Sequence, residues 1–273
     1  MPVFKRAGEG EATRPDTPRV IDLLTRESTK SDHVEAARIA VPKGTGYQAD
    51  VAADEVVWFQ VLRGSGSVNG QPLDRSRVAF TSAAGSLDLT AEEDLDLLWV
   101  RVPAASRFDP KLASDGRELT VIDWSREPIL QSEHDSRNRI YMATPALVGT
   151  DAIKAEMVTY PPGTAAPEHH HVGAEHFQFV LSGKGTAVLN GEPLELAAGD
   201  VLYHYEHELH YFFTDPGSGE DFVFVEFFVP GHCETVWVDA ASACAWLPTG
   251  KDSTGNAPTR EIAYHVHGDD GGI

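Results

Sequence analysis

The sequence predicts an all-β protein that contains two copies of one small β-domain. Short apolar or alternating runs, rich in Val, Phe, Trp and Leu, recur about every 8–12 residues and are separated by Gly, Pro and Asn. The two halves of the chain also repeat the same order of turns and strands. Helical periodicity is scarce, and residues 19–27 and 239–247 are the two modest helix candidates. This pattern is typical of a β-sandwich or a β-barrel.

The first part of the internal repeat has no gap. Residues 41–68 align with residues 160–187 at an offset of 119, which places Gly64 opposite Gly183. The chain therefore divides into a flexible N-terminal tail (1–18), a first β-domain (19–103), a linker (104–139), a second β-domain (140–247) and a flexible C-terminal tail (248–273).

The composition excludes several classes of partner. The chain has 22 Lys and Arg against 42 Asp and Glu, a formal net charge of −20, which disfavours nucleic acid and anionic membranes. The first residues lack the apolar segment of a signal peptide, and there is no uncharged apolar run of about 18 residues. The two cysteines are too few for a disulfide scaffold. We therefore expect a soluble, cytoplasmic protein.

Seven of the twelve histidines lie between residues 169 and 210. Imidazole is a common ligand of Fe, Cu, Ni and Zn, and successive residues of a strand point to opposite faces. His169 and His171 therefore share one face, and His176, which opens the next strand, meets that face if the two strands are neighbours. His210 would add a ligand from a distant strand. The sequence thus predicts a metal site made by His169, His171, His176 and His210.

The first half of the repeat lacks these ligands. In the alignment of the two halves, the four ligand positions are taken by Asp50, Ala52, Val57 and Leu87. The first half keeps the pattern of turns and strands but only one carboxylate at a ligand position. We therefore expect its domain to be metal-free.

At these residues the chain resembles the cupin family. Residues 163–183 contain a Gly, an H-x-H, a further ligand and a closing Gly, as in the first cupin motif, and residues 199–212 are similar to the second. The resemblance covers residues 155–230 well and residues 38–103 in degenerate form. It implies a bicupin: two tandem jelly-roll barrels (double-stranded β-helices) with few short helices, of which the first is degenerate and the second binds the metal.

One ligand position departs from the family pattern. The acidic ligand of the first motif stands six residues before the closing Gly, which here is Gly183, and the count arrives at His176 instead of a carboxylate. Glu175 would need seven intervening residues and would point to the other face. Four histidines are the preferred set, and three histidines with Glu175 are the alternative.

Four neutral imidazoles leave both charges of a divalent metal uncompensated, which favours an anionic, chelating substrate. They also favour Fe, Cu, Ni and Zn over Mn or Mg. The resemblance to cupin dioxygenases implies one divalent transition metal per chain, with Fe(II) favoured and Mn, Ni, Zn or Cu as alternatives. The predicted function is an Fe(II)-type dioxygenase that cleaves or oxidises a small oxygen-rich organic molecule. A non-oxidative metal-dependent lyase, isomerase or hydrolase and a non-catalytic small-molecule-binding cupin are the competing hypotheses.

Further residues are candidates for the chemistry around the metal. Acid–base candidates are Glu175, Glu226 and His207, and candidates for lining the substrate pocket are Gln178, Tyr203, Met157 and Phe212. Glu226 stands alone in a Phe-rich strand, so it is either exposed, structurally paired or held for a function. Gln178 serves either the pocket or a structural hydrogen bond, and Met157 and Phe212 either the pocket or the core. The expected partners are a small-molecule substrate, O2 and, from the resemblance, a second copy of the chain in a homodimer.

Overall fold

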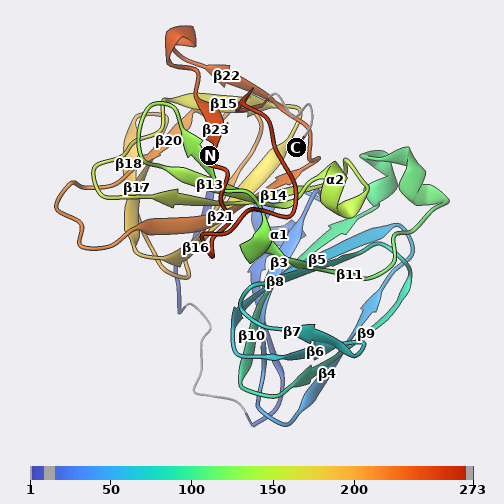
Figure 1. Cartoon of the computed structure of the whole chain (residues 1–273). Coiled ribbons are helices and arrows are strands. Elements are labelled where there is room, and N and C mark those ends of the chain that lie inside the picture. Colours follow the sequence, from blue (N-terminus) through green and yellow to red (C-terminus); the bar gives the residue numbers. More distant parts are fainter. Residues whose placement is uncertain (1, 9–15, 269–272) are drawn as a thin grey trace. The chain divides into compact units, whose positions relative to one another are not determined.

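The computed structural model describes residues 2–8, 16–268 and 273. The chain forms two compact units, each made of β-strands (Figure 1). The N-terminal unit contains residues 8–125 and 147–152, and the C-terminal unit contains residues 1–7, 126–146 and 153–273. In the described part of the chain, no helix has the length and apolar character needed to cross a membrane.

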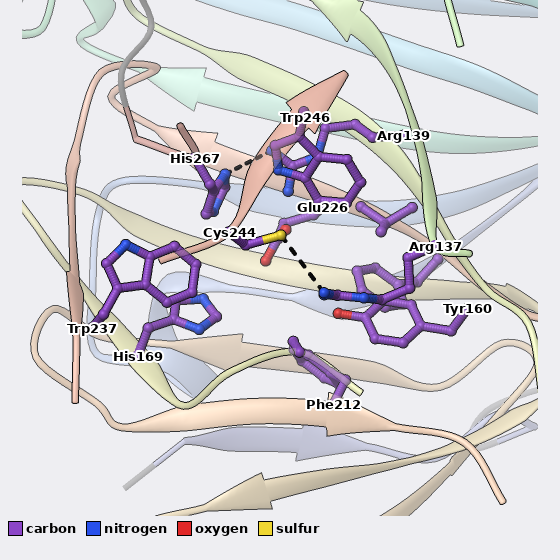
Figure 2. A pocket seen from close by; sticks show the side chains of 13 residues that line it. Arg137, Arg139, Tyr160, His169, Phe212, Glu226, Trp237, Cys244, Trp246 and His267 are labelled. Carbon is purple, nitrogen blue, oxygen red and sulfur yellow. Dashed lines mark hydrogen bonds between the residues drawn. The ribbon is translucent and has the colours of Figure 1, made fainter. Parts of the chain in front are cut away.

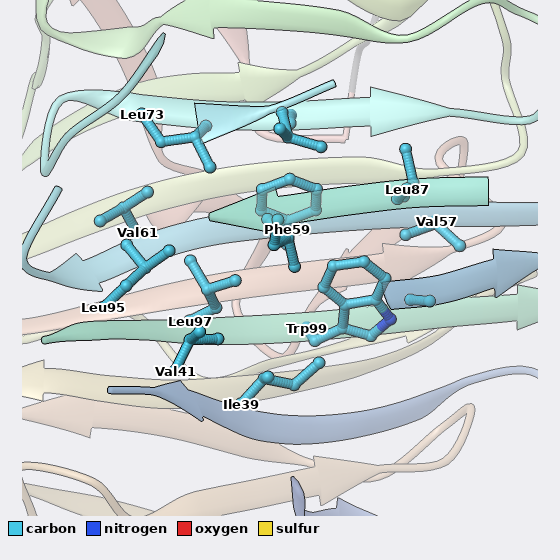
Figure 3. Packing of buried hydrophobic residues seen from close by; sticks show 14 of the residues in the cluster. Ile39, Val41, Val57, Phe59, Val61, Leu73, Leu87, Leu95, Leu97 and Trp99 are labelled. Atoms are coloured by element: carbon cyan, nitrogen blue, oxygen red, sulfur yellow. The ribbon is translucent and has the colours of Figure 1, made fainter. Parts of the chain in front are cut away.

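The N-terminal unit contains a six-stranded and a four-stranded antiparallel sheet, in the orders β11-β8-β5-β10-β3-β2 and β4-β9-β6-β7. Their strands are β2 (Arg19–Leu24), β3 (Glu35–Val41), β4 (Gly46–Val51), β5 (Glu55–Arg63), β6 (Gly66–Val68), β7 (Gln71–Leu73), β8 (Arg77–Thr81), β9 (Gly85–Ala91), β10 (Leu95–Pro103) and β11 (Thr120–Asp123). Alternate residues of both sheets bury apolar side chains in one cluster between them (Figure 3). Phe59 and Trp99 stack at its centre, with ring centroids 4.8 Å apart.

The C-terminal unit contains a nine-stranded sheet, β1-β19-β16-β21-β14-β13-β12-β23-β24, and a five-stranded sheet, β18-β17-β20-β15-β22. Their strands are β1 (Val3–Lys5), β12 (Leu130–Ser132), β13 (Asn138–Ala143), β14 (Lys154–Tyr160), β15 (His169–Val172), β16 (Glu175–Ser182), β17 (Lys184–Leu189), β18 (Glu192–Ala197), β19 (Val201–His204), β20 (His210–Phe213), β21 (Phe222–Val229), β22 (Glu234–Trp237), β23 (Ala245–Pro248) and β24 (His265–Val266). Tyr160, Phe212 and Phe224 are part of its apolar core.

Helices are short and few among the described residues. They are α1 (Arg26–Thr29), α2 (Pro145–Val148) and the 3-10 turns η1 (Ala105–Arg107), η2 (Pro110–Ala113), η3 (Trp124–Arg126) and η4 (Ala240–Ser242). The helix expected over residues 19–27 is wrong, because its first six residues form β2 and pair with β3. The candidate at 239–247 contains only η4, and its last residues lie in β23.

The structure divides the chain differently from the predicted domain boundaries. The stretch 104–139, predicted as a linker, contains β11, which pairs with β8 of the N-terminal unit, and β12, which pairs with β13 and β23 of the C-terminal unit. Near the N-terminus, where a flexible tail is predicted, β1 pairs with β19; residues 1 and 9–15 of that prediction lie outside the described residues. Mixed polarity hid these strands; two of them, β1 and β11, lie at sheet edges, where strands expose many polar residues.

The predicted flexible tail 248–273 is also packed onto the C-terminal unit over its described residues. Its loop is polar, as expected, but Asp252 accepts hydrogen bonds from the backbone of Thr254 and Asn256, both 2.9 Å. Further on, β24 pairs with β23, and the side chains of His265 and His267 are buried. Local hydrogen bonds and a few buried anchors order a segment whose composition resembles a linker.

The repeat seen in the sequence is real, but its register shifts by one residue at the ligand strand. Backbone N–H groups of Ala91 and Thr214 donate to the equivalent carbonyls of Thr45 and Thr164. From these points β4 pairs regularly. In the C-terminal unit, by contrast, three residues (166–168) stand opposite only two (211 and 212) between the Ala165–Phe213 pair and the His169–His210 pair. One residue is thus inserted before β15, and one is missing in the following loop.

The alignment of the ligand positions changes accordingly. Ala49, opposite Leu87, is the counterpart of His169, opposite His210, and Val51 is the counterpart of His171. Asp50, which the gapless alignment places at a ligand position, is exposed on the other face of β4. The residues equivalent to the predicted ligands are therefore Ala49, Val51, Val57 and Leu87, all of which are buried and apolar.

Candidate metal centre and cavity

Three strands of the C-terminal unit bring the four predicted ligands together. His169 and His171 lie on the same face of β15, His176 on β16 and His210 at the start of β20, paired with His169. All four side chains are buried. Neighbouring rings in the cluster have centroids 4.6 to 5.4 Å apart. Strand alternation and the pairing of β15 with β20 bring His169, His171 and His210 together, whereas His176 comes from β16 of the other sheet and not from a strand paired with β15.

Hydrogen bonds fix which nitrogen of each ring is available. Nδ1 of His169 lies 2.8 Å from the carbonyl oxygen of Pro167, and Nδ1 of His210 lies 2.8 Å from that of Glu208. A carbonyl only accepts, so both Nδ1 atoms carry the proton and both Nε2 atoms hold a lone pair. Nδ1 of His171 lies 3.1 Å from the hydroxyl of Thr235. Such outer hydrogen bonds are the usual way in which proteins orient metal-binding histidines.

Four ring nitrogens of the cluster are left without a hydrogen bond. Nε2 of His171, Nε2 of His210 and both nitrogens of His176 are buried without a hydrogen bond. Burial lowers the pKa of these histidines well below the ordinary value, to about 4 for His210. The rings are therefore neutral and present lone pairs toward one another, which costs free energy unless a metal ion binds them. This donor set fits a divalent transition metal.

The structure brings two further residues to the cluster. One group with mutually close ligand atoms consists of His171, His176, His210 and Glu226, and a second consists of His169, His171 and His267. Within each group the ligand atoms lie within 4.8 Å of one another. Both metal-compatible groups found in the described residues belong to the C-terminal unit. His204 stacks on His176 with centroids 4.6 Å apart but belongs to neither group.

A row of polar side chains crosses the sheet beside the cluster. Gln178 on β16, Glu226 on β21 and Glu156 on β14 are direct cross-strand neighbours. The amide of Gln178 donates to Oε1 of Glu226 over 2.7 Å, and Nε2 of His176 lies 3.7 Å from the same oxygen. Burial, followed by repulsion from Glu156, raises the pKa of Glu226 to about 8. Glu226 is thus a buried, hydrogen-bonded carboxyl and not an exposed one.

A small cavity adjoins the cluster and is shown in Figure 2. Its polar wall includes Arg137, Arg139, Glu226, His169 and His267, and its apolar wall includes Tyr160, Phe212, Trp237 and Trp246. Both arginines are buried. Arg139 lies 3.2 Å from Glu156 and stacks over Trp246 at 4.2 Å, and Arg137 lies 2.8 Å from Asp135. The cavity therefore combines a possible metal site with fixed hydrogen-bond donors and aromatic walls.

The other predicted pocket residues lie in different places. The hydroxyl of Tyr203 donates to Glu175, and both residues lie on strand faces opposite to those of His204 and His176. Met157 points to the face of β14 opposite Glu156, and neither it nor Tyr203 lines the cavity. The structure therefore brings none of these three predicted residues to the cluster.

His207 also lies apart from the cavity. Its side chain is 63% exposed, and its ring lies against that of His170. Its backbone N–H, however, donates to the carbonyl of His171 over 2.9 Å. Phe212, in contrast, belongs to the apolar core and also lines the cavity.

Sequence reasoning missed the residues contributed by neighbouring strands. Arg137, Arg139 and Tyr141 alternate with other residues along one stretch, and Glu156 occupies the same face of the next strand. The polar residues recur at every second position, which was the available signal, but Arg137 and Arg139 both fell within the predicted linker. His267 belongs to an H-x-H in the stretch predicted as a flexible tail, and its return to the site requires the pairing of β24 with β23.

The N-terminal unit replaces the polar row with apolar residues. Phe59, Trp99 and Ala37 are cross-strand neighbours at the positions of Gln178, Glu226 and Glu156. A stacked aromatic pair thus occupies the place of a hydrogen-bonded amide and carboxyl. These apolar side chains offer no metal ligand at the equivalent positions.

Comparison with known proteins agrees with this architecture. Residues 156–228 match the family described as the cupin domain. Two solved structures of oxalate decarboxylase variants from Bacillus subtilis are similar, with TM-scores of 0.67 and 0.66. The chain folds as two tandem cupin barrels. Each match has 16% sequence identity and covers 86% of this chain and 79% of the other chain. The comparison with curated proteins found no match at all.

Proposed function

We propose that this bicupin is a metal-dependent enzyme that acts on a small anionic organic molecule. The observation that carries the proposal is the convergence of buried, neutral imidazole nitrogens beside a cavity that holds two arginines and Glu226. Buried polar groups without partners are rare in folded proteins unless a ligand satisfies them. A purely structural barrel would have no need of such a cluster, and the N-terminal unit fills the same positions with apolar residues.

The proposed ligands are His169, His171, His176 and His210. The competing arrangement exchanges His169 for Glu226. We favour His169 because the carbonyl of Pro167 fixes its tautomer with Nε2 as the acceptor, whereas Oε1 of Glu226 already accepts a hydrogen bond from Gln178. Nitrogen ligands alone favour Fe, Ni, Cu or Zn, and among these we propose Fe(II), with Mn as an alternative.

The charges around the cavity favour an anionic substrate. Four neutral imidazoles would not compensate a divalent ion. Each cavity arginine is paired with one carboxylate: Arg137 with Asp135 and Arg139 with Glu156. These pairs leave the net charge of the wall close to zero. A substrate carboxylate or enolate would supply the missing negative charge. The aromatic residues of the wall exclude water and strengthen these interactions.

When bound, the metal would supply a Lewis acid and, if it is iron, one-electron chemistry with O2. The chain would supply orientation and proton transfer. Arg137 and Arg139 are placed to hold substrate oxygens, because guanidinium groups bind carboxylates through several parallel hydrogen bonds. The carboxyl of Glu226 lies on the cavity wall and is held by Gln178, so it is placed to donate or accept a proton at a substrate atom.

The leading reaction is oxidative cleavage by a dioxygenase. A non-oxidative lyase is the second candidate, because the carboxyl of Glu226 beside two arginines also suits a decarboxylation in which a proton replaces CO2. The similar structures are of oxalate decarboxylase, which by its name acts on oxalate. Oxalate and other small carboxylates are therefore the first substrates to test.

Oxygen uptake and CO2 release distinguish the two reactions. Iron-loaded protein is mixed with a panel of small mono- and dicarboxylates and diketones in an oxygen electrode, and CO2 is measured in parallel. Substrate-dependent O2 consumption supports a dioxygenase, and CO2 release without O2 consumption supports a lyase. The variant Glu226→Gln should reduce turnover at unchanged metal content. Metal binding without turnover of any compound would contradict an enzymatic function and favour a binding protein.

A further inference from the structure

The end of the chain contributes to the wall of the metal cavity. After the loop, β24 pairs with β23, and the backbone N–H of His267 donates to the carbonyl of Cys244 over 2.9 Å. The side chain of His267 is only 6% exposed and lines the cavity. This residue lies 39 positions beyond the last residue that matches the cupin domain, residue 228, so it is an addition to that domain.

The ring of His267 faces the metal cluster. Its centroid lies 5.4 Å from that of His171 and 6.0 Å from that of His169. The contact is possible because the next residue is Gly268. A Cβ atom there would lie 2.7 Å from the hydroxyl of Thr235, the same hydroxyl that holds Nδ1 of His171. The C-terminal segment therefore packs directly on a residue that orients a proposed ligand.

A hydrogen bond from Arg139 fixes the tautomer of His267. Nη1 of Arg139 lies 2.6 Å from Nδ1 of His267, as the dashed line in Figure 2 shows. A guanidinium only donates, so Nδ1 accepts, and Nε2 of the neutral ring must carry the hydrogen. The two nitrogens point in different directions from an imidazole ring. The N–H of His267 therefore points away from Arg139, and Nε2 has no lone pair with which to bind a metal.

We propose that His267 donates a hydrogen bond to an anionic oxygen of the substrate while that substrate is bound at the metal. This inference rests on the proposed function and adds one residue to it. It also distinguishes His267 from His169, whose Nδ1 donates to the carbonyl of Pro167 and whose Nε2 therefore holds a lone pair. His267, which accepts from Arg139 and lines the cavity, keeps an N–H to donate, whereas His169, which donates to a carbonyl, keeps a lone pair.

Arg139 ties this donor to the rest of the site. It lies 3.2 Å from Glu156, the cross-strand neighbour of Glu226, and packs over Trp246. Its position is thereby fixed on two sides, so His267 is held without paying the entropy of a free side chain when substrate binds. Arg139 acts through His267 as a positioning residue in addition to its own contact with the cavity.

The test compares substitutions that keep or remove the donor. His267→Gln places an amide N–H near the original Nε2, and His267→Leu keeps the volume without a donor. His265→Gln is the matched control, because His265 is buried on the same segment and binds Tyr141 outside the cavity. Metal content, melting temperature and the affinity of the metal-loaded protein for oxalate, used as a chelating anion, are measured for each.

We expect all three variants to retain the metal. His267→Leu should bind oxalate about 10- to 100-fold more weakly, the effect of losing one hydrogen bond to a charged group. His267→Gln should recover most of the affinity, and His265→Gln should bind as wild type does. Equal oxalate affinity in wild type and His267→Leu would overturn the proposed role of His267 but not the proposed function. Loss of metal from His267→Leu at an unchanged melting temperature would make it a ligand and also overturn the inference. Wild-type protein that binds no metal would overturn the proposed function itself.

Discussion

Glu226 makes the stability of the metal-free protein depend on pH in a direction opposite to that of most carboxylates. Its pKa is about 8 in the folded chain, against an ordinary value of 4.5, because burial and the neighbouring Glu156 disfavour the charged form. Between these two values the folded state holds a proton that the unfolded state has released. Folding stability contributed by this proton is therefore fully present below pH 4.5 and is lost as the pH rises through 8.

The magnitude follows from the difference of the two pKa values. At 1.36 kcal/mol per unit, the free energy of unfolding should fall by up to about 5 kcal/mol between pH 4.5 and pH 8 on account of Glu226. Glu226→Gln keeps the shape and a hydrogen-bonding group but cannot ionise. Relative to wild type, this variant should therefore gain stability as the pH rises.

The assay is urea unfolding of chelator-treated protein at several pH values from 5 to 8.5, followed by tryptophan fluorescence. The difference in free energy of unfolding between Glu226→Gln and wild type should grow with pH. The variant Glu192→Gln, which removes an exposed carboxylate of β18, is the control and should show a constant difference. A constant difference for Glu226→Gln as well would refute the buried, protonated state of Glu226.

Three further predictions concern metal binding and folding. Thr235→Val should weaken metal affinity about 10- to 100-fold, measured by chelator competition, because it removes the hydrogen bond that orients His171; unchanged affinity would contradict that role. Gly183→Ala should cost more than about 3 kcal/mol of unfolding free energy, because its φ is +73° and the added Cβ would lie 2.1 Å from a carbonyl oxygen, whereas Gly191→Ala, at φ +86° in open space, should cost about 1–2 kcal/mol. Similar costs for the two would contradict the close approach. Deletion of residues 262–273 should destabilise the C-terminal unit by about 3–6 kcal/mol, because two buried isoleucine side chains are lost; an unchanged melting temperature would show that the segment is not anchored.

Most of the fold could be predicted from the sequence because it depends on local patterns. Alternating apolar runs mark strands, and the paired glycines Gly64 and Gly183 mark equivalent turns where a side chain would strike a neighbouring backbone carbonyl. The pairing of His169 and His171 in the site is equally local, since the alternation of β15 places both side chains on one face. The choice of His176 over Glu175 followed from the same alternation, and the structure places His176 in the cluster and Glu175 on the other face.

The rest of the site depends on pairing between distant strands, which local patterns do not encode. Glu156 meets Glu226 only because β14 pairs with β21, and Arg139 meets His267 only because the last strand adds to β23. The shifted register at β15 was hidden for a similar reason. The C-terminal unit has one extra residue before β15 and one fewer in the loop after it, so the two changes cancel within a few positions. The gapless alignment therefore placed Asp50 opposite His169, although Ala49 is the structural equivalent of His169.

The central claim is that the buried histidines hold a metal, and the metal content of protein purified without chelator tests it most directly. Mass spectrometry of the wild type should find about one transition metal ion per chain, with iron expected. His176→Ala should lose the metal and Glu175→Ala should keep it, because only the first residue lies in the cluster. No bound metal in the wild type, even after reconstitution with iron, manganese and zinc, would contradict the account. Loss of metal in Glu175→Ala alone would contradict the proposed ligand set.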